Sequence, residues 1–176
     1  MCRSLMAAAC LLSIGVQAVQ QANFVMGTQA IYGPSDNVYN FTGKDALTEQ
    51  TRGVIRMGAN QFKMRLAPKS TCAGYHLRCK DNDPSSLKGL AQEPEVAAAF
   101  SLPDLVWYQL WLYSFANNEF LGKDWTEAMV EAEYNETKAW AVHMLTTYSG
   151  TGKTFFAGNW EGDWARLGGA ALEFFI

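Results

Sequence analysis

Hydrophobic residues make up 49% of the 176-residue chain, which is enough for a buried core, and the formal net charge is −3 at pH 7. Neither sign of charge forms a long run, which argues against nucleic acid as a partner because phosphate binding needs a basic face. The length suffices for one core but falls short of the roughly 250 residues of a complete eight-stranded β/α barrel.

The N-terminus has the layout of a secretory signal peptide. Arg3 supplies a positive charge, residues 5–16 are almost wholly apolar, and small residues precede a cleavage position after Ala18. The apolar stretch is too short to span a bilayer comfortably, although a retained anchor is the alternative. We expect residues 1–18 to be removed, leaving residues 19–176 as one secreted, extracellular domain without membrane contact.

Export makes a disulfide the expected state of the two cysteines that remain, Cys72 and Cys79. Metal binding is the competing interpretation, but structural zinc usually takes four Cys or His ligands and the chain has only two histidines. We therefore expect no metal site. The sequons that begin at Asn40 and Asn135 agree with export and predict surface positions if they are glycosylated, although in a bacterium they carry no meaning.

Two strands separated by a helix are predicted in the first half of the chain. Residues 24–31 favour a strand, residues 43–57 have the apolar spacing of a helix, and residues 60–66 alternate polar and apolar side chains. A loop over residues 69–84 is expected to hold the cysteine pair.

The alternation in the second strand separates its side chains into two sets. Lys63 and Arg65 are expected on one face, opposite Phe62, Met64 and Leu66. In a barrel strand, one face meets the helices and the other faces the interior.

Two further strands follow in the second half. Residues 86–100 predict a short helix that is disturbed at Pro94. Residues 105–113 are rich in β-formers and predict a strand, with a buried helix as the rival interpretation. A fourth, buried strand is expected to begin at residues 154–157.

The longest helix is predicted from an N-cap at Asp124, with Glu127 in a capping-box position, to about Thr147. The spacing predicts one helical stripe as its apolar face: Val130, Tyr134, Thr137, Ala141, Leu145 and Tyr148. The strands and helices alternate along the chain, and this order favours a parallel sheet with right-handed crossovers.

The fourth strand leads into the most informative residues of the chain. Glu161 beside Trp160 fits a poorly solvated carboxylic acid with a raised pKa, suited to protonate a glycosidic oxygen. Asn159 has the chemistry to hydrogen-bond a sugar hydroxyl, Trp160 or Trp164 to stack on a pyranose ring, and Asp163 to orient Glu161 or bind substrate. The alternative is a polar turn with solvated carboxylates, a composition common at strand ends.

Residues 150–154, Gly-Thr-Gly-Lys-Thr, have a partial likeness to a phosphate-binding loop. That motif requires glycine where Thr147 stands, and it connects a strand to a helix, whereas this segment leaves a helix and enters a strand. We therefore expect no nucleotide and no cofactor.

With four β/α-type units ending in Asn159-Trp160-Glu161, the chain resembles the N-terminal half of a TIM-barrel glycoside hydrolase. In the large clan of retaining enzymes with this fold, the acid/base glutamate ends the fourth strand directly after an asparagine, and the nucleophile comes from the seventh strand. The resemblance implies that Glu161 is the acid/base. Asn159 matches only approximately, because Trp160 intervenes, and the nucleophile has no counterpart.

The expected fold is thus an incomplete (β/α)8 TIM barrel of about four units. The resemblance implies an exported, glycoside-hydrolase-like protein that acts on O-glycosidic bonds of a carbohydrate and is inactive as the isolated chain. Its outer strands are expected to be open edges, which suggests pairing with a second half-barrel or with itself. The alternative function is a non-catalytic carbohydrate-binding or surface-interaction protein.

Overall fold

The computed structural model describes residues 27–29, 42–79, 84–116 and 125–158 of the chain. The predicted signal peptide lies outside these ranges. None of the helices in the described part of the chain combines the length and the apolar character needed to cross a membrane.

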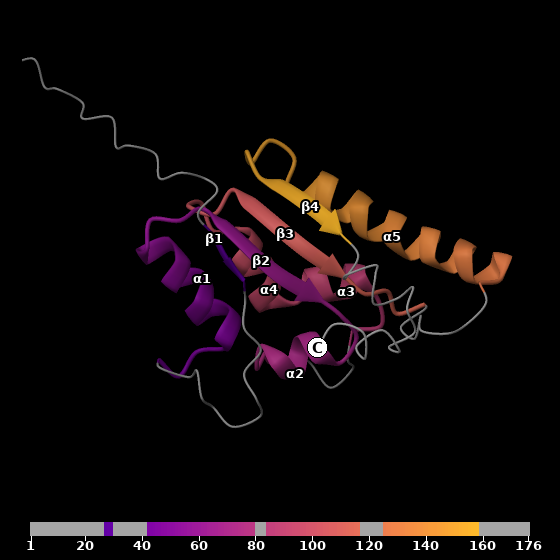
Figure 1. Cartoon of the computed structure of the whole chain (residues 1–176), viewed down its shortest axis with the longest axis horizontal. Coiled ribbons are helices and arrows are strands. Elements are labelled where there is room, and N and C mark those ends of the chain that lie inside the picture. Colours follow the sequence, from indigo (N-terminus) through magenta and orange to yellow (C-terminus); the bar gives the residue numbers. More distant parts are fainter. Residues whose placement is uncertain (1–26, 30–41, 80–83, 117–124, 159–176) are drawn as a thin grey trace, which may run out of the picture.

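A four-stranded parallel sheet forms the centre of the molecule (Figure 1). Its strands are β1 (Gly27–Gln29), β2 (Gln61–Leu66), β3 (Trp107–Leu112) and β4 (Thr154–Gly158), and they pair in chain order. The predicted parallel sheet is therefore confirmed, and the rival helix for the third strand is wrong. Among the described strands, β1 and β4 are the edges of the sheet.

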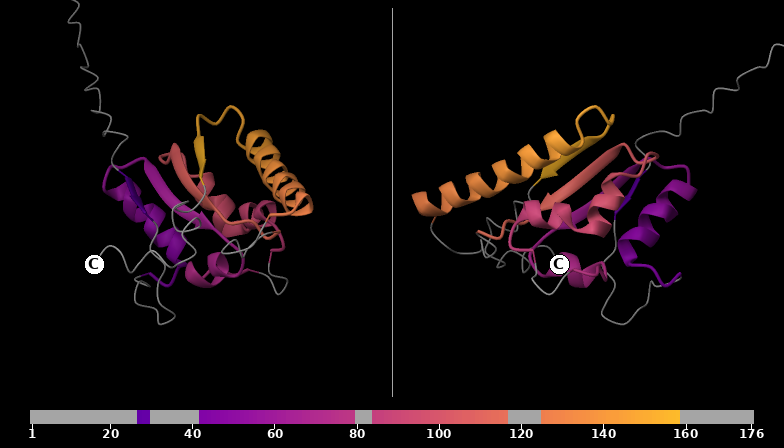
Figure 2. Two further views of the ribbon diagram at one scale, coloured as in Figure 1. Left: turned by 45° about the vertical axis from the view of Figure 1, so that its right-hand side comes forward. Right: turned by 180° about the vertical axis from the view of Figure 1, so that it is seen from behind.

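The connections between these strands are helical. They are α1 (Ala46–Arg56), α2 (Ser70–Gly74), α3 (Leu87–Gln92), α4 (Pro94–Phe100) and α5 (Glu127–Thr147). Helices α1, α3, α4 and α5 lie on one side of the sheet, and α2 lies near the end of β2 (Figures 1 and 2). Pro94 separates α3 from α4, as its missing N–H predicts.

The side chains of β2 alternate as the sequence predicts. Phe62, Met64 and Leu66 are at most 1% exposed and belong to the core beneath the helices. Lys63 and Arg65 lie on the opposite face and are half-buried. One face of the sheet is therefore apolar and the other carries charge.

Phe100 lies at the centre of an aromatic cluster that joins helices to the sheet. Its ring meets Tyr108, Tyr148 and Phe155 edge-on or nearly so, with centroids 5.2, 5.9 and 5.3 Å away. The Tyr108 hydroxyl donates a hydrogen bond of 2.7 Å to the Ala99 carbonyl, and burial, with a smaller contribution from Tyr148, raises the pKa of Tyr108. Edge-to-face aromatic pairs add to the stability that burial of these rings provides.

Helix α5 begins later than predicted. Its N-cap is Thr126, whose hydroxyl accepts a hydrogen bond from the Met129 N–H, and not Asp124, which lies outside the described residues. Asp and Thr are both good N-caps, so their identity alone did not decide between the two positions.

The predicted apolar face of α5 is also wrong over most of its length. Val130, Tyr134 and Leu145 are 55%, 60% and 74% exposed, whereas Trp140 and Met144 are buried. Apolar residues occur on both sides of this helix, so the spacing rule alone did not show which stripe meets the core.

Two further expectations need correction. The segment predicted as a loop over residues 69–84 contains the short helix α2. Strand β4 is not buried: its residues Phe156, Ala157 and Gly158 are exposed, because β4 is an edge of the described sheet.

Candidate functional site

The residues that the sequence singles out as a site lie just beyond the described part of the chain. Asn159, Trp160, Glu161, Asp163 and Trp164 all follow β4 and fall outside the described residues. What the structure gives is the strand that leads to them and the sheet face beside it.

The face of the sheet opposite the helices is rich in amides, aromatic rings and cations. Register and side-chain alternation assign to it one set of residues, here named the polar face: Gly27, Gln29, Gln61, Lys63, Arg65, Trp107, Gln109, Trp111, Thr154, Phe156 and Gly158. It carries two cationic side chains and no acidic one.

The cations of the polar face lie beside aromatic rings. The Lys63 ammonium is 3.6 Å from the centroid of the Trp111 ring, and the Arg65 guanidinium is 5.9 Å from that of Tyr113. Lys63 pairs in register with Gln109, two residues before Trp111, so its side chain reaches toward the carboxyl end of β3. A cation above an aromatic face is attracted by the ring quadrupole, which helps to fix its position.

A second aromatic contact joins β3 to β4. The rings of Trp107 and Phe156 are stacked, with centroids 5.5 Å apart and an angle of 13° between their planes. Phe156 is still 49% exposed, so this pair leaves apolar surface open on the polar face.

A hollow of about 140 Å³ opens between β1, β2 and β3. It is lined by Gly27, Thr28, Gln29, Gln61, Lys63 and Gln109. A Cβ atom at position 27 would lie 2.7 Å from the Cβ of Gln61, so the close approach of these two strands requires glycine there. The hollow is therefore lined by three amide side chains and by the side chain of Lys63, whose ammonium lies beside it over the Trp111 ring.

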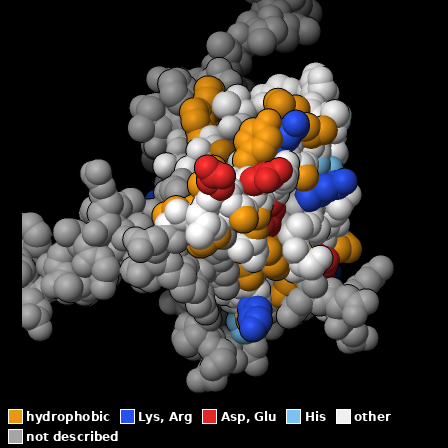
Figure 3. All heavy atoms as spheres, turned by 90° about the vertical axis from the view of Figure 1, so that its right-hand side faces the viewer, with side chains coloured by type: hydrophobic (Ala, Val, Ile, Leu, Met, Phe, Trp, Pro, Cys, Tyr) orange, Lys and Arg blue, Asp and Glu red, His pale blue; other side chains and the backbone are white. Residues whose placement is uncertain are grey.

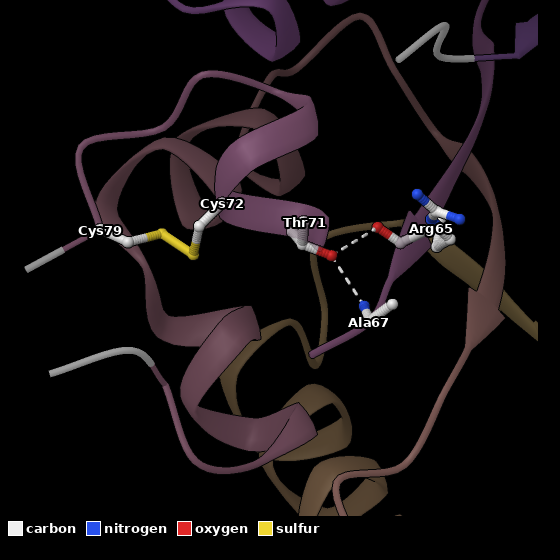
Figure 4. The surroundings of a disulfide bond; sticks show 5 residues. All are labelled: Arg65, Ala67, Thr71, Cys72 and Cys79. Atoms are coloured by element: carbon white, nitrogen blue, oxygen red, sulfur yellow. Dashed lines mark hydrogen bonds between the residues drawn. A yellow bond between two sulfur atoms is a disulfide. The ribbon is translucent and has the colours of Figure 1, made fainter. Parts of the chain in front are cut away.

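The carboxyl end of β2 is held by α2 (Figure 4). The Thr71 hydroxyl accepts a 2.7 Å hydrogen bond from the Ala67 N–H and donates a 3.3 Å bond to the Arg65 carbonyl. The buried Tyr75 hydroxyl accepts a 2.9 Å hydrogen bond from the Arg65 N–H. These bonds fix the backbone from which the Arg65 side chain projects.

Cys72 and Cys79 are joined by a disulfide, as expected, with their Cα atoms 5.8 Å apart (Figure 4). Cys72 belongs to α2, so the bond links that helix to the segment that follows it. A short closed loop of this kind restricts the unfolded chain and thereby supports the α2 contacts with β2.

Glu136 on α5 orders the backbone that follows β3. Its carboxylate accepts hydrogen bonds from the N–H groups of Phe115 at 3.0 Å and Ala116 at 2.8 Å, and from that of Leu87, at the start of α3, at 3.0 Å. Glu136 thus acts as a local support for the β3 carboxyl end, a role that the sequence did not reveal.

Figure 3 views the molecule from the right-hand side of Figure 1, where acidic, basic and apolar side chains intermingle on the surface.

Replacing Glu136 with glutamine should lower the free energy of unfolding by about 1–3 kcal/mol, because one amide oxygen cannot serve three N–H donors as a carboxylate does. Urea unfolding followed by circular dichroism measures the change. Glu131→Gln, at an exposed position on the same helix, is the control and should stay within about 0.5 kcal/mol. Equal stability of the two variants would contradict the supporting role of Glu136.

Lys153, which belongs to the partial phosphate-loop likeness, has a structural role. Its ammonium donates hydrogen bonds to the carbonyls of Leu102 at 2.5 Å and Leu105 at 2.8 Å. Desolvation lowers its pKa, and Asp104 acts in the opposite direction. The residue lies directly before β4, and its hydrogen bonds join the connection that enters β4 to the one that enters β3.

Of the two predicted sequons, Asn135 is exposed on α5, whereas Asn40 lies outside the described residues. Within the part of the chain that the structure describes, no group of three or more His, Cys, Asp or Glu side chains is placed to hold a metal ion.

Comparison with protein-family models, curated proteins and solved structures gives no match for this chain.

Proposed function

We propose that this chain is a carbohydrate-active protein built on the first four units of a (β/α)8 barrel. In this proposal the protein is exported and acts on O-glycosidic bonds, with Glu161 as the general acid/base. Asn159, Trp160, Asp163 and Trp164 contact the sugar or orient Glu161.

The single observation that carries the proposal is the position of β4. It is a parallel strand paired with β3, and it ends at Gly158, three residues before Glu161. Enzymes built on parallel β/α units place their catalytic residues at the carboxyl ends of the strands. The closeness of Glu161 to this strand end in the sequence supports its assignment to such a site.

The polar face supports the same assignment. In a barrel this face is the interior, and its carboxyl end borders the site. Trp111, near the carboxyl end of β3, provides aromatic surface there, and Phe156 and Gln109 add a ring and an amide in the middle of the same face. Aromatic rings beside amides are the groups that recognise the apolar faces and the hydroxyls of sugars.

Exposed apolar side chains favour a barrel that continues beyond β4. Of seven large hydrophobic residues that are exposed in the described part of the chain, six lie from residue 125 onward, on or near α5 and β4. They are Trp125, Val130, Tyr134, Val142, Leu145 and Phe156. In a closed barrel, each helix and each strand packs against neighbours on both sides. Additional β/α units would therefore bury these exposed side chains.

Glycoside hydrolysis requires two carboxylates, and the proposal assigns only one of them to this chain. The second is expected from strands supplied by additional sequence or by a second half-barrel. We therefore expect the purified 176-residue chain to bind oligosaccharides without cleaving them.

Tryptophan fluorescence titration with a panel of oligosaccharides tests binding, because tryptophans border the polar face. Reducing-sugar release from the same panel tests turnover. Saturable fluorescence changes without product formation are expected, and no response to any saccharide would contradict the proposal.

The extent of the gene distinguishes the enzyme from the alternative. Sequence that continues into further β/α units, with a glutamate ending the seventh strand, favours the enzyme. A chain complete without them favours a non-catalytic carbohydrate-binding protein.

A further inference from the structure

The charge of the polar face differs from that of the whole chain. The chain has a formal net charge of −3, yet the eleven described positions of this face carry Lys63 and Arg65 and no acidic residue. The two cations are two residues apart on one strand, a separation of about 7 Å along the chain. Their charged groups lie beside neighbouring aromatic rings, Trp111 and Tyr113, so the positive charge of this face is concentrated near the carboxyl ends of β2 and β3.

Lys63 is also positioned for binding a ligand. Within the described residues, its recorded interaction is the one with the Trp111 ring, and no carboxylate is paired with it. An ammonium group has three N–H donors, and a ring face cannot accept all of them in well-directed hydrogen bonds. The ring therefore holds the cation in place and leaves donors directed away from it.

The hollow beside Lys63 supplies the rest of the recognition surface. Lys63 shares its lining with the amide side chains of Gln29, Gln61 and Gln109, which donate and accept hydrogen bonds. Hydroxyl groups are suitable partners for these amides, and an anionic group is the suitable partner for Lys63. A neutral sugar would leave the ammonium without an acceptor of opposite charge.

We propose that the polar face binds an anionic saccharide, whose carboxylate or sulfate group is held by Lys63 with support from Arg65. Gln29, Gln61 and Gln109 contact the hydroxyls of the charged sugar. This inference rests on the proposed carbohydrate function and defines the class of sugar that it selects.

The test compares two ligands that share a backbone and differ in charge: trigalacturonic acid and its neutral methyl ester. Each is titrated into the purified full chain while tryptophan fluorescence is recorded. The acid should bind about tenfold or more tightly than the ester at low salt, because charge-assisted hydrogen bonds are the stronger kind. The preference should shrink in about 0.5 M salt, where screening is strong. A sulfated galactose oligosaccharide, titrated in parallel, distinguishes a sulfate from a carboxylate ligand.

Lys63→Met keeps the length of the side chain and removes its charge, so it should abolish most of the preference for the acid. Lys138→Met, at an exposed position on α5, is the control and should retain it. Equal binding of acid and ester by the unmodified chain, or a preference that survives Lys63→Met in a folded protein, would overturn the inference but leave the proposed function standing. Failure of every saccharide, acidic or neutral, to bind would overturn both.

Discussion

Glu161→Gln should lower kcat/KM by about 10²–10⁴-fold in a form of the protein that contains the complete site, because this is the usual contribution of a general acid or base. Glutamine preserves the shape of the side chain but cannot donate a proton to the glycosidic oxygen. The loss should be largest for natural glycosides, whose alkoxide leaving groups need protonation. It should be smaller for aryl glycosides, whose leaving groups depart without a proton.

The measurement is therefore a pair of rate profiles, one for an oligosaccharide and one for a nitrophenyl glycoside. Glu131→Gln is the control: it removes an exposed carboxylate on α5, outside the proposed site, and should leave both rates unchanged. A Glu161→Gln variant with unchanged turnover of the oligosaccharide would exclude Glu161 as the acid. Turnover by the isolated chain that Glu161→Gln abolishes would instead imply a second catalytic carboxylate within this chain.

Phe100→Ala should cost about 3–5 kcal/mol of the free energy of unfolding, the usual range for truncating a buried phenylalanine. The ring is fully buried and contacts Tyr108, Tyr148 and Phe155, so its removal leaves a cavity between α4, β3 and β4. Domains are usually stable by only about 5–15 kcal/mol in total, so this loss is a large fraction of the stability. Urea unfolding, followed by circular dichroism, gives the change in midpoint.

Phe156→Ala makes the same substitution on the polar face, where the ring is 49% exposed. It loses only the stacking with Trp107 and part of its buried area, so we expect a cost of about 1 kcal/mol. A loss of only about 1 kcal/mol for Phe100→Ala as well would contradict the central role of Phe100 in the aromatic cluster.

The two faces of β3 follow from a pattern that is present in the sequence. Residues 107–112, Trp-Tyr-Gln-Leu-Trp-Leu, alternate with the same period of two that separated the faces of β2. Applied to β3, that rule assigns Trp107, Gln109 and Trp111 to one face and Tyr108 with Leu110 to the core, as the structure does. The contact of Lys63 with Trp111 needed the register between the strands as well.

The long-range contacts that support the fold were beyond any local pattern. Glu136 hydrogen-bonds to Leu87, 49 residues away, and Lys153 to Leu102, 51 residues away. A charged residue on a helix or in a turn is usually solvated, and only the assembled fold brings a carboxylate to three backbone donors. The exposed stripe on α5 has the same origin, since only packing decides which of two apolar stripes of a helix faces the core.

The sequence by itself determined the order of strands and helices, the parallel sheet and the opposite faces of β2, because hydrophobic period and turn residues act over a few neighbouring positions. It also indicated the disulfide between Cys72 and Cys79 through the small number and close spacing of the cysteines. Only the tertiary structure decided the register that assembles the polar face and the long-range hydrogen bonds of Glu136 and Lys153. These features depend on residues that are distant in sequence and meet only when the chain is folded.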